Sequence, residues 1–517
     1  MSSTNMVENG AKTGAKNGGL DLTGGAIGTT MILFALPTLA SSILQSLNGS
    51  INAVWVGRFL GEEALAATTN GNLVMFLLVS FVFGFGMAAT ILIGQAMGRR
   101  APNDARRAVG TALGAIIPLS AVIAVLGFVF APQLLDLLGT PGAAAPLALS
   151  YLRVIFVAMP TALTFTLLMM ALRGTGDSMT PLWFMCVSVG LDIVLNPLLI
   201  LGLGPFPELG IAGSALATVI GNTAALIGLV VTIYVRRSPL ALRGTDLRLL
   251  IPDPAVLRLM MVKGLPIGLQ MIVISSAAIT MLSLINREGV ATAAAYGVTQ
   301  QLWTYVQMPA MALSAAVSAM AAQNIGAGQW GRVSAITKWG LIFNIGLTGA
   351  LIGVLTLFDR AALALFVGAD SEALPIGQHI QLVATWGYLF FGVAQVLFGT
   401  MRANGYVIGP LIVMIVSMYP VRLGFAFGLY PVLAADALWL SFPAGMVATA
   451  LMAAALYLRG GWREGKMTPA REAAQGSCTY RDATGSCTPS AEIVGDTRRI
   501  TPGRQNAGQE GGASYVS

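Results

Sequence analysis

Charged residues are scarce in this sequence. Only 10% of its 517 residues are charged, whereas 56% are hydrophobic and the mean hydropathy is +0.76. A soluble protein carries about 25% charged residues, so the composition excludes that class and predicts a polytopic membrane protein. The net charge of +7 does not indicate nucleic-acid binding, because the basic residues fall in short connections between apolar segments.

Residues that build metal and catalytic sites are also few. The single histidine is His379, and the three cysteines, Cys186, Cys478 and Cys487, have neither metal-ligand spacing nor the pattern of a disulfide framework. The apolar segments hold no His/Asp/Glu metal set, Ser-His pair or glycine-rich phosphate loop. We therefore expect no enzyme, no catalytic residue, no metal site and no cofactor other than a coupling ion, H⁺ or Na⁺.

Carboxylates are almost missing from the depth of the apolar segments. The exception is Asp192, in the middle of the stretch from Thr180 to Leu203, which is long enough to cross a bilayer. Asn196 follows on the same helix face, and Pro197 removes a backbone hydrogen bond beside it. A charge at this depth costs about 2.5 kcal/mol or more and usually serves an ion, proton or substrate pathway. We interpret Asp192 and Asn196 as such a site; the alternative is a structural acid paired with a buried base or hydrogen-bond donor.

Twelve apolar segments can be counted, and the basic residues alternate between their connections. Arginines are concentrated in the second, sixth and eighth connections, while the odd-numbered connections hold few. Under the positive-inside rule this bias predicts that both termini lie in the cytoplasm. We expect a multi-pass monomer in the inner (plasma) membrane, in contact with the lipid bilayer.

The two halves of the chain repeat. Three residues that follow the fourth segment recur 229 residues later: Arg173, Gly176 and Pro181 as Arg402, Gly405 and Pro410. Each half holds six spans, so both halves enter the membrane in the same direction. The predicted fold class is an all-α integral membrane protein with twelve transmembrane helices. They form two six-helix lobes related by a parallel pseudo-two-fold repeat, which favours an alternating-access transporter over a channel.

These features divide the chain into five parts. We expect a cytoplasmic N-terminal tail over residues 1–26, an N-lobe over 27–236, an inter-lobe linker over 237–255, a C-lobe over 256–459 and a disordered cytoplasmic tail over 460–517. The last part lacks periodicity and is rich in small and charged residues. Arg173 and Arg402, at span ends on the cytoplasmic side, are interpreted as topology determinants.

Several motifs, in order along the chain, resemble those of one transporter family. In the first half they are the run from Leu36 to Ala67 (LPTLASSILQSLNGSINAVWVGRFLGEEALAA), GQAMGRR, ALRGTGDSMTP and LGIAGSALATVIG; in the second they are GLPIGLQ, AQNIGAG and FGTMRANG. From about Ile27 to Leu458 the chain resembles the MATE transporters, the multidrug and toxic-compound extrusion family. The resemblance implies twelve helices in two lobes and export of bulky, often cationic, amphipathic compounds, driven by inward flow of protons or sodium.

The sequence departs from the family pattern at the coupling residues. Where many relatives carry an Asp on the first helix, this chain has Asn52. On the fifth helix the family order of Asn and then Asp is inverted, with Asp192 before Asn196. Acids that some relatives bear on the seventh and tenth helices are missing, which argues against a sodium site of C-lobe carboxylates. Coupling would then depend on Asp192, assisted by Asn196 and Asn52.

Polar and aromatic residues on two helices are candidates for a substrate cavity. Those chosen are Gln45, Asn48, Gln300, Trp303, Tyr305 and Gln307. The first two belong, with Asn52, to a polar stripe on the first helix, for which interhelical hydrogen bonding is an equal alternative. The other four form a cluster on the eighth helix, for which an interfacial aromatic belt is the alternative.

Some further residues are weaker candidates. Asn70 and Asn72 on the second segment are weaker candidates for the polar lining of the cavity. Ser214, Thr218 and Asn222 on the sixth segment are also weaker candidates, and for that segment we favour helix packing. Arg422 falls within one residue of the repeat-equivalent of Asp192 and is either its partner or a structural residue.

The sequence as a whole predicts a secondary active antiporter. We expect it to export cationic or amphipathic organic compounds in exchange for protons, by rocking of two lobes around a central cleft. Sodium coupling and a lipid-linked oligosaccharide flippase of the wider superfamily are the alternatives. The expected partners are small organic, often cationic, substrates and the lipid bilayer, with no nucleic acid.

Overall fold

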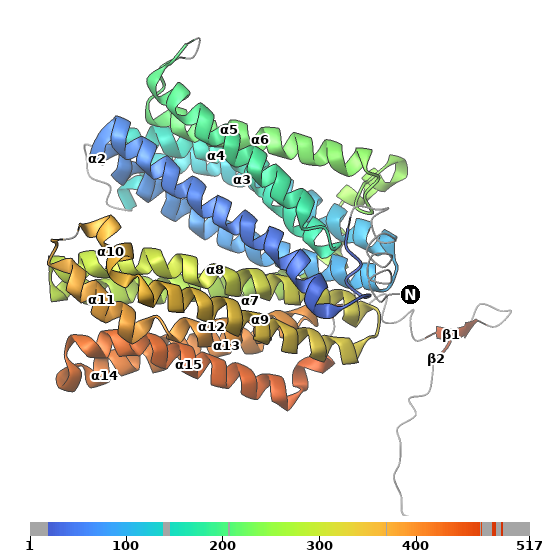
Figure 1. Ribbon diagram of the computed structural model, residues 1–517. Coiled ribbons are helices and arrows are strands. Elements are labelled where there is room, and N and C mark those ends of the chain that lie inside the picture. Colours follow the sequence, from blue (N-terminus) through green and yellow to red (C-terminus); the bar gives the residue numbers. More distant parts are fainter. Residues whose placement is uncertain are drawn as a thin grey trace, which may run out of the picture. The chain divides into compact units, whose positions relative to one another are not determined.

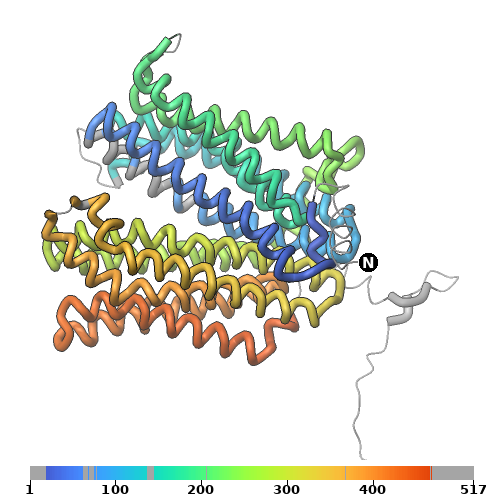
Figure 2. The backbone as a smooth tube through the Cα atoms, viewed as in Figure 1, coloured from blue at the N-terminus to red at the C-terminus, as the bar shows by residue number. Residues whose placement is uncertain are grey.

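Figure 1 shows a computed structural model of the chain. The described residues are 19–137, 145–204, 207–368, 370–465, 467, 478–481 and 487–489. Figure 2 draws the same chain as a tube, in which the helices follow one another back and forth. Residues up to Met467 form one unit and those from Thr468 another.

Long helices make up nearly all of the first unit. In chain order they are α2 (Ile27–Gly98), α3 (Pro102–Leu137), α4 (Ala145–Gly174), α5 (Met179–Leu201), α6 (Ile211–Val235), α7 (Pro254–Ile285), α8 (Val290–Gly326), α9 (Trp330–Leu357), α10 (Asp359–Val367), α11 (Ala373–Ala384), α12 (Gly387–Ala403), α13 (Ile408–Val416), α14 (Gly424–Leu433) and α15 (Ala435–Arg459). A π-helical segment, η4 (Ser417–Leu423), joins α13 to α14. Short 3-10 turns, η2 (Gly244–Leu250), η3 (Asn286–Glu288) and η5 (Gly461–Glu464), lie in connections.

The predicted spans correspond to these helices. Eleven helices in the described ranges are long and apolar enough to cross a membrane, and the number rises to twelve if the pair α11 and α12, bent by 46°, counts as one span. α2 holds two spans, because the backbone breaks at Gly61, whose φ of 84° and ψ of −175° are not helical. Glycine adopts this conformation without the steric cost that a side chain would add.

The helices divide into two lobes within the first unit, as the repeat predicts. α2 to α6 pack on one another in the N-lobe and α7 to α15 in the C-lobe, and the lobes meet where α2 contacts α7 and α8 (Figure 1). The all-helical, two-lobe fold class is therefore confirmed.

Glycines bring the lobes into close contact near one end of the helices, which we call the basic end because it carries Arg99, Arg236 and Arg332. A Cβ atom added at Gly98 would lie 1.9 Å from the Gln323 carbonyl oxygen, and one added at Gly326 would lie 2.1 Å from the Gln95 carbonyl oxygen. The same two glutamines hydrogen-bond across the interface: Gln95 Nε2 donates to the Ala403 carbonyl (2.8 Å) and Gln323 Nε2 to the Gly174 carbonyl (3.0 Å). The lobes are therefore closed on each other at the basic end.

The residues just before α2 contact both lobes at this end. The Leu20 amide donates to the Gly176 carbonyl of the N-lobe (3.2 Å), and the Leu22 carbonyl accepts from Asn324 Nδ2 of the C-lobe (2.9 Å). Leu22 is fully buried, and Arg332 donates to the carbonyls of Gly24 and Gly25. Part of the segment predicted as a tail is thus packed against the lobes.

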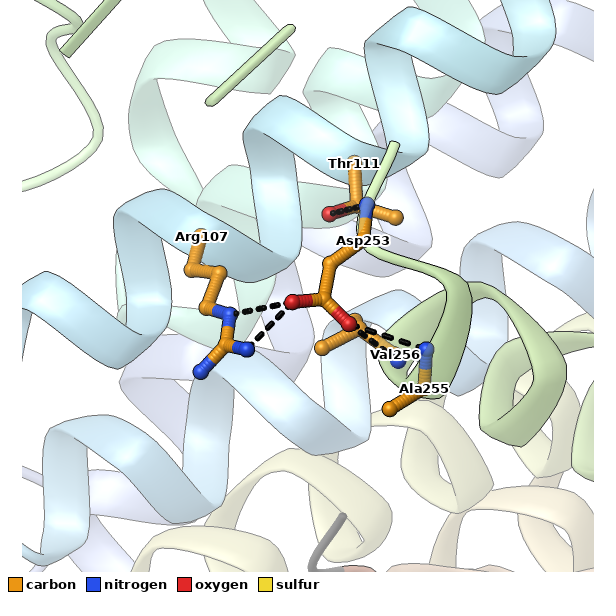
Figure 3. A network of polar contacts seen from close by, with 5 residues as sticks. All are labelled: Arg107, Thr111, Asp253, Ala255 and Val256. Carbon is orange, nitrogen blue, oxygen red and sulfur yellow. Dashed lines mark hydrogen bonds and ion pairs between the residues drawn. The ribbon is translucent and has the colours of Figure 1, made fainter. Parts of the chain in front are cut away.

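The inter-lobe linker is ordered and attached to both lobes. Its last turn presents Asp253 as the N-cap of α7, where the carboxylate accepts from the Ala255 and Val256 amides (2.9 and 3.3 Å). Arg107 of α3 forms an ion pair with the same carboxylate (Figure 3), and this hydrogen bond is the main cause that lowers the pKa of Asp253 below its usual value. The Asp253 amide in turn donates to Thr111 Oγ1 (3.3 Å), so α3 is tied to the start of α7.

The start of the predicted disordered tail is structured. η5 directly follows α15, and Trp462 on it is 1% exposed and stacks on Tyr457. In the second unit, the described residues form two short antiparallel strands, β1 (Cys478–Arg481) and β2 (Cys487–Pro489). Disorder of the other tail residues stays a prediction, because they lie outside the described ranges.

Candidate functional site

Asp192 lies inside the N-lobe and receives hydrogen bonds from two other helices. It is 1% exposed on α5. Asn48 Nδ2 and Asn52 Nδ2 of α2 donate to its Oδ2 atom (2.7 and 2.9 Å), and Thr218 Oγ1 of α6 donates to its Oδ1 atom (3.1 Å). A buried carboxylate is stable only when such donors replace water. The site is therefore built from donors that compensate a negative charge.

Asn196 extends this network by one turn of α5. It is fully buried, and its Nδ2 atom donates to Asn52 Oδ1 (2.8 Å). The three residues predicted as the coupling site, Asp192, Asn196 and Asn52, are thus connected by hydrogen bonds. Two amide oxygens of the network, Asn48 Oδ1 and Asn196 Oδ1, are buried without a hydrogen-bond partner in the described part of the chain.

The local sequence of α5 explains why these groups face inward. Asp192 and Asn196 are four residues apart and share one face with the buried residues Ser188 and Val189. Pro197 lies within the helix, which runs on to Leu201. Because proline has no N–H, the carbonyl four residues earlier, that of Ile193, has no helical donor.

A cavity of about 190 Å³ lies beside the network in the N-lobe. Its lining includes Asn52 and Thr218, which both bond to Asp192, together with Thr68, Tyr151 and Asn222. Asp192 itself does not line the cavity, so these donors stand between the carboxylate and the open space. The cavity is large enough for several water molecules, each of which occupies about 30 Å³.

Sequence reasoning missed part of this site. Thr218 is only a weak candidate in the sequence, where helix packing is favoured for it, yet it bonds to Asp192. Tyr151 of α4 was not singled out, because one tyrosine in an apolar segment carries no spacing signal. Asn222 Oδ1 accepts from Ser188 Oγ (2.8 Å) and lines the cavity. The side chains of Asn70 and Asn72 lie outside those that the structure describes.

The other predicted cavity residues are not gathered around Asp192. Gln45 is exposed on α2, and Gln300 is exposed on α8. Tyr305 and Gln307 are half-buried on α8, whereas Trp303 is 1% exposed and donates from Nε1 to Thr385 Oγ1 (2.8 Å). The α8 cluster therefore belongs to the C-lobe, and Trp303 packs in its core.

The three arginines singled out in the sequence differ in their surroundings. Arg422 does not pair with Asp192, because its guanidinium lies over the Phe442 ring, 3.8 Å from the ring centroid. Arg402 is buried, and its Nη2 atom donates to Gln270 Oε1 (2.8 Å) and more weakly to Gln395 Oε1 (3.4 Å). Arg173 ends α4, and its Nε atom is buried without a hydrogen-bond partner among the described residues.

Two helical lobes that meet at one end, with a buried carboxylate and a polar cavity inside one lobe, define a class of protein. They are the features of a polytopic membrane transporter with paired lobes. The comparisons with known proteins narrow this class to a family.

The model of the MatE family matches residues 37–198 and 266–427. The two matched segments begin 229 residues apart, which equals the repeat shift read from the sequence. The chain belongs to the MatE family of membrane transporters, and it is not an enzyme.

Individual relatives agree with this assignment. The chain is 38% identical over 425 residues to the probable multidrug resistance protein YoeA of Bacillus subtilis (strain 168), which covers 82% of this chain and 92% of that protein. The probable multidrug resistance protein YpnP of the same strain is 28% identical, over 81% of this chain and 91% of that protein. A crystal structure of MATE in complex with MaL6 superposes with a TM-score of 0.80 at 20% identity, over 86% and 99% of the two chains, and supports the fold.

Proposed function

We propose that this transporter is a secondary active antiporter that exports cationic or amphipathic organic compounds in exchange for protons. The observation that carries the proposal is the Asp192 site: a carboxylate buried in the N-lobe and held by Asn48, Asn52 and Thr218. Its cavity supplies a place for water or for part of a substrate. The names of the relatives as multidrug resistance proteins support organic compounds as the substrates.

Exchange of a proton for a cation follows if both ligands depend on the carboxylate of Asp192. A proton on Asp192 removes the negative charge that attracts a cation, and loss of the proton restores it. Asn52 and Thr218 line the cavity and bond to Asp192, so a cation in the cavity is separated from the carboxylate by one layer of polar side chains. Cation and proton would then bind in turn, which couples their movements.

The orientation in the membrane is part of the proposal. The basic end would face the cytoplasm of the inner membrane, as the positive-inside rule requires, and both termini would lie on that side. The contacts between Gly98 and Gln323 close this end, which in the proposed orientation would be an outward-facing state of alternating access. The chain would work as a monomer, because each copy holds both lobes.

Sodium is the alternative coupling ion, and one observation favours it. Asn48 Oδ1 and Asn196 Oδ1 are buried oxygens without a partner among the described residues. Together with the Asp192 carboxylate and the Ile193 carbonyl, they offer the oxygen ligands that such a hard cation prefers.

The test is substrate movement in proteoliposomes that hold the purified protein, with a pH gradient and a Na⁺ gradient imposed separately. Movement of a fluorescent organic cation driven by the pH gradient alone supports the proposal, and movement driven by Na⁺ alone supports the alternative. Asp192→Asn should abolish the coupled movement. Coupled transport at the wild-type rate by a folded Asp192→Asn protein would refute the role of this residue.

A further inference from the structure

The C-lobe contains a buried positive charge that the proposed mechanism does not use. Arg422 is 6% exposed on η4, in the middle of the span from Ile408 to Leu433. Its guanidinium lies over Phe442 of α15, which belongs to an aromatic cluster with Tyr296 and Trp303 of α8, Tyr388 of α12 and Trp439 of α15. A guanidinium in such a place is costly, and intramembrane charges are retained mainly at functional sites.

Few partners compensate this charge. The Phe442 ring covers one face of the guanidinium at 3.8 Å, and the Tyr296 phenol interacts with it. Nη1 contacts the sulfur of Met418 at 3.8 Å, and Nε is buried without a hydrogen-bond partner among the described residues. No carboxylate of the described chain forms an ion pair with Arg422. An arginine has five N–H donors in one plane; here one face of that plane is covered by Phe442, while the edge at Nε has no acceptor among the described residues.

Two further features distinguish Arg422 from a residue that only packs in the core. They are the backbone conformation around it and its position in the repeat. η4 is a π-helical turn that includes Pro420, and single π-turns within helices occur frequently at functional sites. Position 422 lies one residue from the repeat-equivalent of Asp192, since the repeat shift is 229. The two lobes thus bury charges of opposite sign at corresponding depths.

We propose that Arg422 and its aromatic surroundings form a binding site for the carboxylate of a substrate. The unused edge of the guanidinium would bind the two carboxylate oxygens in the bidentate manner that arginine favours. Tyr296 and Tyr388, which interact with the guanidinium, would contact a flat ring attached to that carboxylate.

The inference rests on the proposed export function and defines its substrate class more narrowly. A zwitterionic amphipathic compound carries an amine that suits the Asp192 site and a carboxylate that suits Arg422. The same compound with its carboxylate esterified keeps only the first interaction. The ratio of export of the free carboxylate to export of the ester therefore tests the interaction with Arg422.

The experiment compares export of a rhodamine dye with a free carboxylate and of its methyl ester, by the full-length protein in proteoliposomes. We expect Arg422→Gln to lower export of the carboxylate dye at least tenfold relative to the ester, and Arg422→Lys to lower it less, because lysine keeps the charge but not the bidentate geometry. Arg402→Gln is the matched control: it also removes a buried arginine of the C-lobe, and the ratio of the two dyes should not change.

Binding is measured independently as the rise in melting temperature that benzoate causes in the purified protein, with benzamide as the neutral analogue. Benzoate should stabilise the wild type more than benzamide does, and Arg422→Gln should lose this difference. An equal loss of both dyes in Arg422→Gln, the same change of ratio in Arg402→Gln, or export of the ester alone by the wild type would overturn the inference. If the wild type exports neither dye, the export function has failed, and the benzoate measurement alone decides for or against the site.

Discussion

The close contact between the lobes at Gly98 predicts that Gly98→Ala destabilises the closed arrangement of the lobes. The distances at this contact give the approximate cost. A Cβ atom at this position would lie 1.9 Å from the Gln323 carbonyl oxygen and 3.0 Å from the Ala327 amide nitrogen. Both obstacles are backbone atoms, in the last turn of α8 and at its C-cap, and they cannot turn aside as a side chain does. Gly98→Ala therefore requires the two helices to separate by about 1 Å or more at the basic end.

The cost of this substitution falls on the closed state alone. Overpacking of a tight contact costs about 1 to 3 kcal/mol, and the penalty disappears when the lobes separate. A cost of about 2 kcal/mol would raise the ratio of open to closed molecules about thirtyfold. We expect Gly98→Ala to shift the protein from the closed toward the open arrangement at the basic end.

The measurement is the distance between spin labels at Asn103 and Gln329, exposed residues on the two lobes at this end. The three native cysteines are replaced by serine so that only the two labelled positions react. Gly98→Ala should add a population with a longer distance. Gly346→Ala on α9, where nothing lies within 4 Å of the new Cβ, is the control and should leave the distance unchanged. An unchanged distance in Gly98→Ala would refute the reasoning.

Two further substitutions test contacts outside the proposed sites. Leu22→Ala removes a fully buried side chain before α2 and should lower the free energy of unfolding by about 2 to 5 kcal/mol, measured as a lower melting temperature in detergent. Asp253→Ala removes the N-cap of α7 and its ion pair with Arg107, and should cost about 1 kcal/mol. Because that pair lowers the pKa of Asp253 in the folded state, its stabilisation is complete above the usual aspartate pKa of about 4 and is lost as the pH falls through the lowered value. The wild type and Asp253→Ala should therefore melt at more similar temperatures under acid conditions than at pH 7, and a constant difference would argue against the ion pair.

The fold was predictable because hydrophobic segments and the repeat are properties of the sequence itself. The shift that relates Arg173 to Arg402 also separates the two MatE matches. The exact start of the second span was not predictable: the break falls at Gly61, and a glycine between Leu60 and Glu62 does not reveal which residue leaves the helix.

The candidate site was predictable only where the residues lie on one helix face. The four-residue spacing of Asp192 and Asn196 placed them together, and the stripe on the first helix supplied Asn48 and Asn52. Thr218 depends on how α6 is rotated against α5, which tertiary packing decides. For the same reason the sequence did not reveal that Trp303 packs in the C-lobe core.

The central claim is that Asp192 exchanges a proton for a substrate. The most direct measurement is proton movement detected by a pH-sensitive dye inside proteoliposomes when an exported cation is added without any imposed gradient. We expect proton movement opposite to the cation in the wild type and no such movement in Asp192→Asn. Cation transport by the wild type with no movement of protons, in sodium-free buffer, would contradict it.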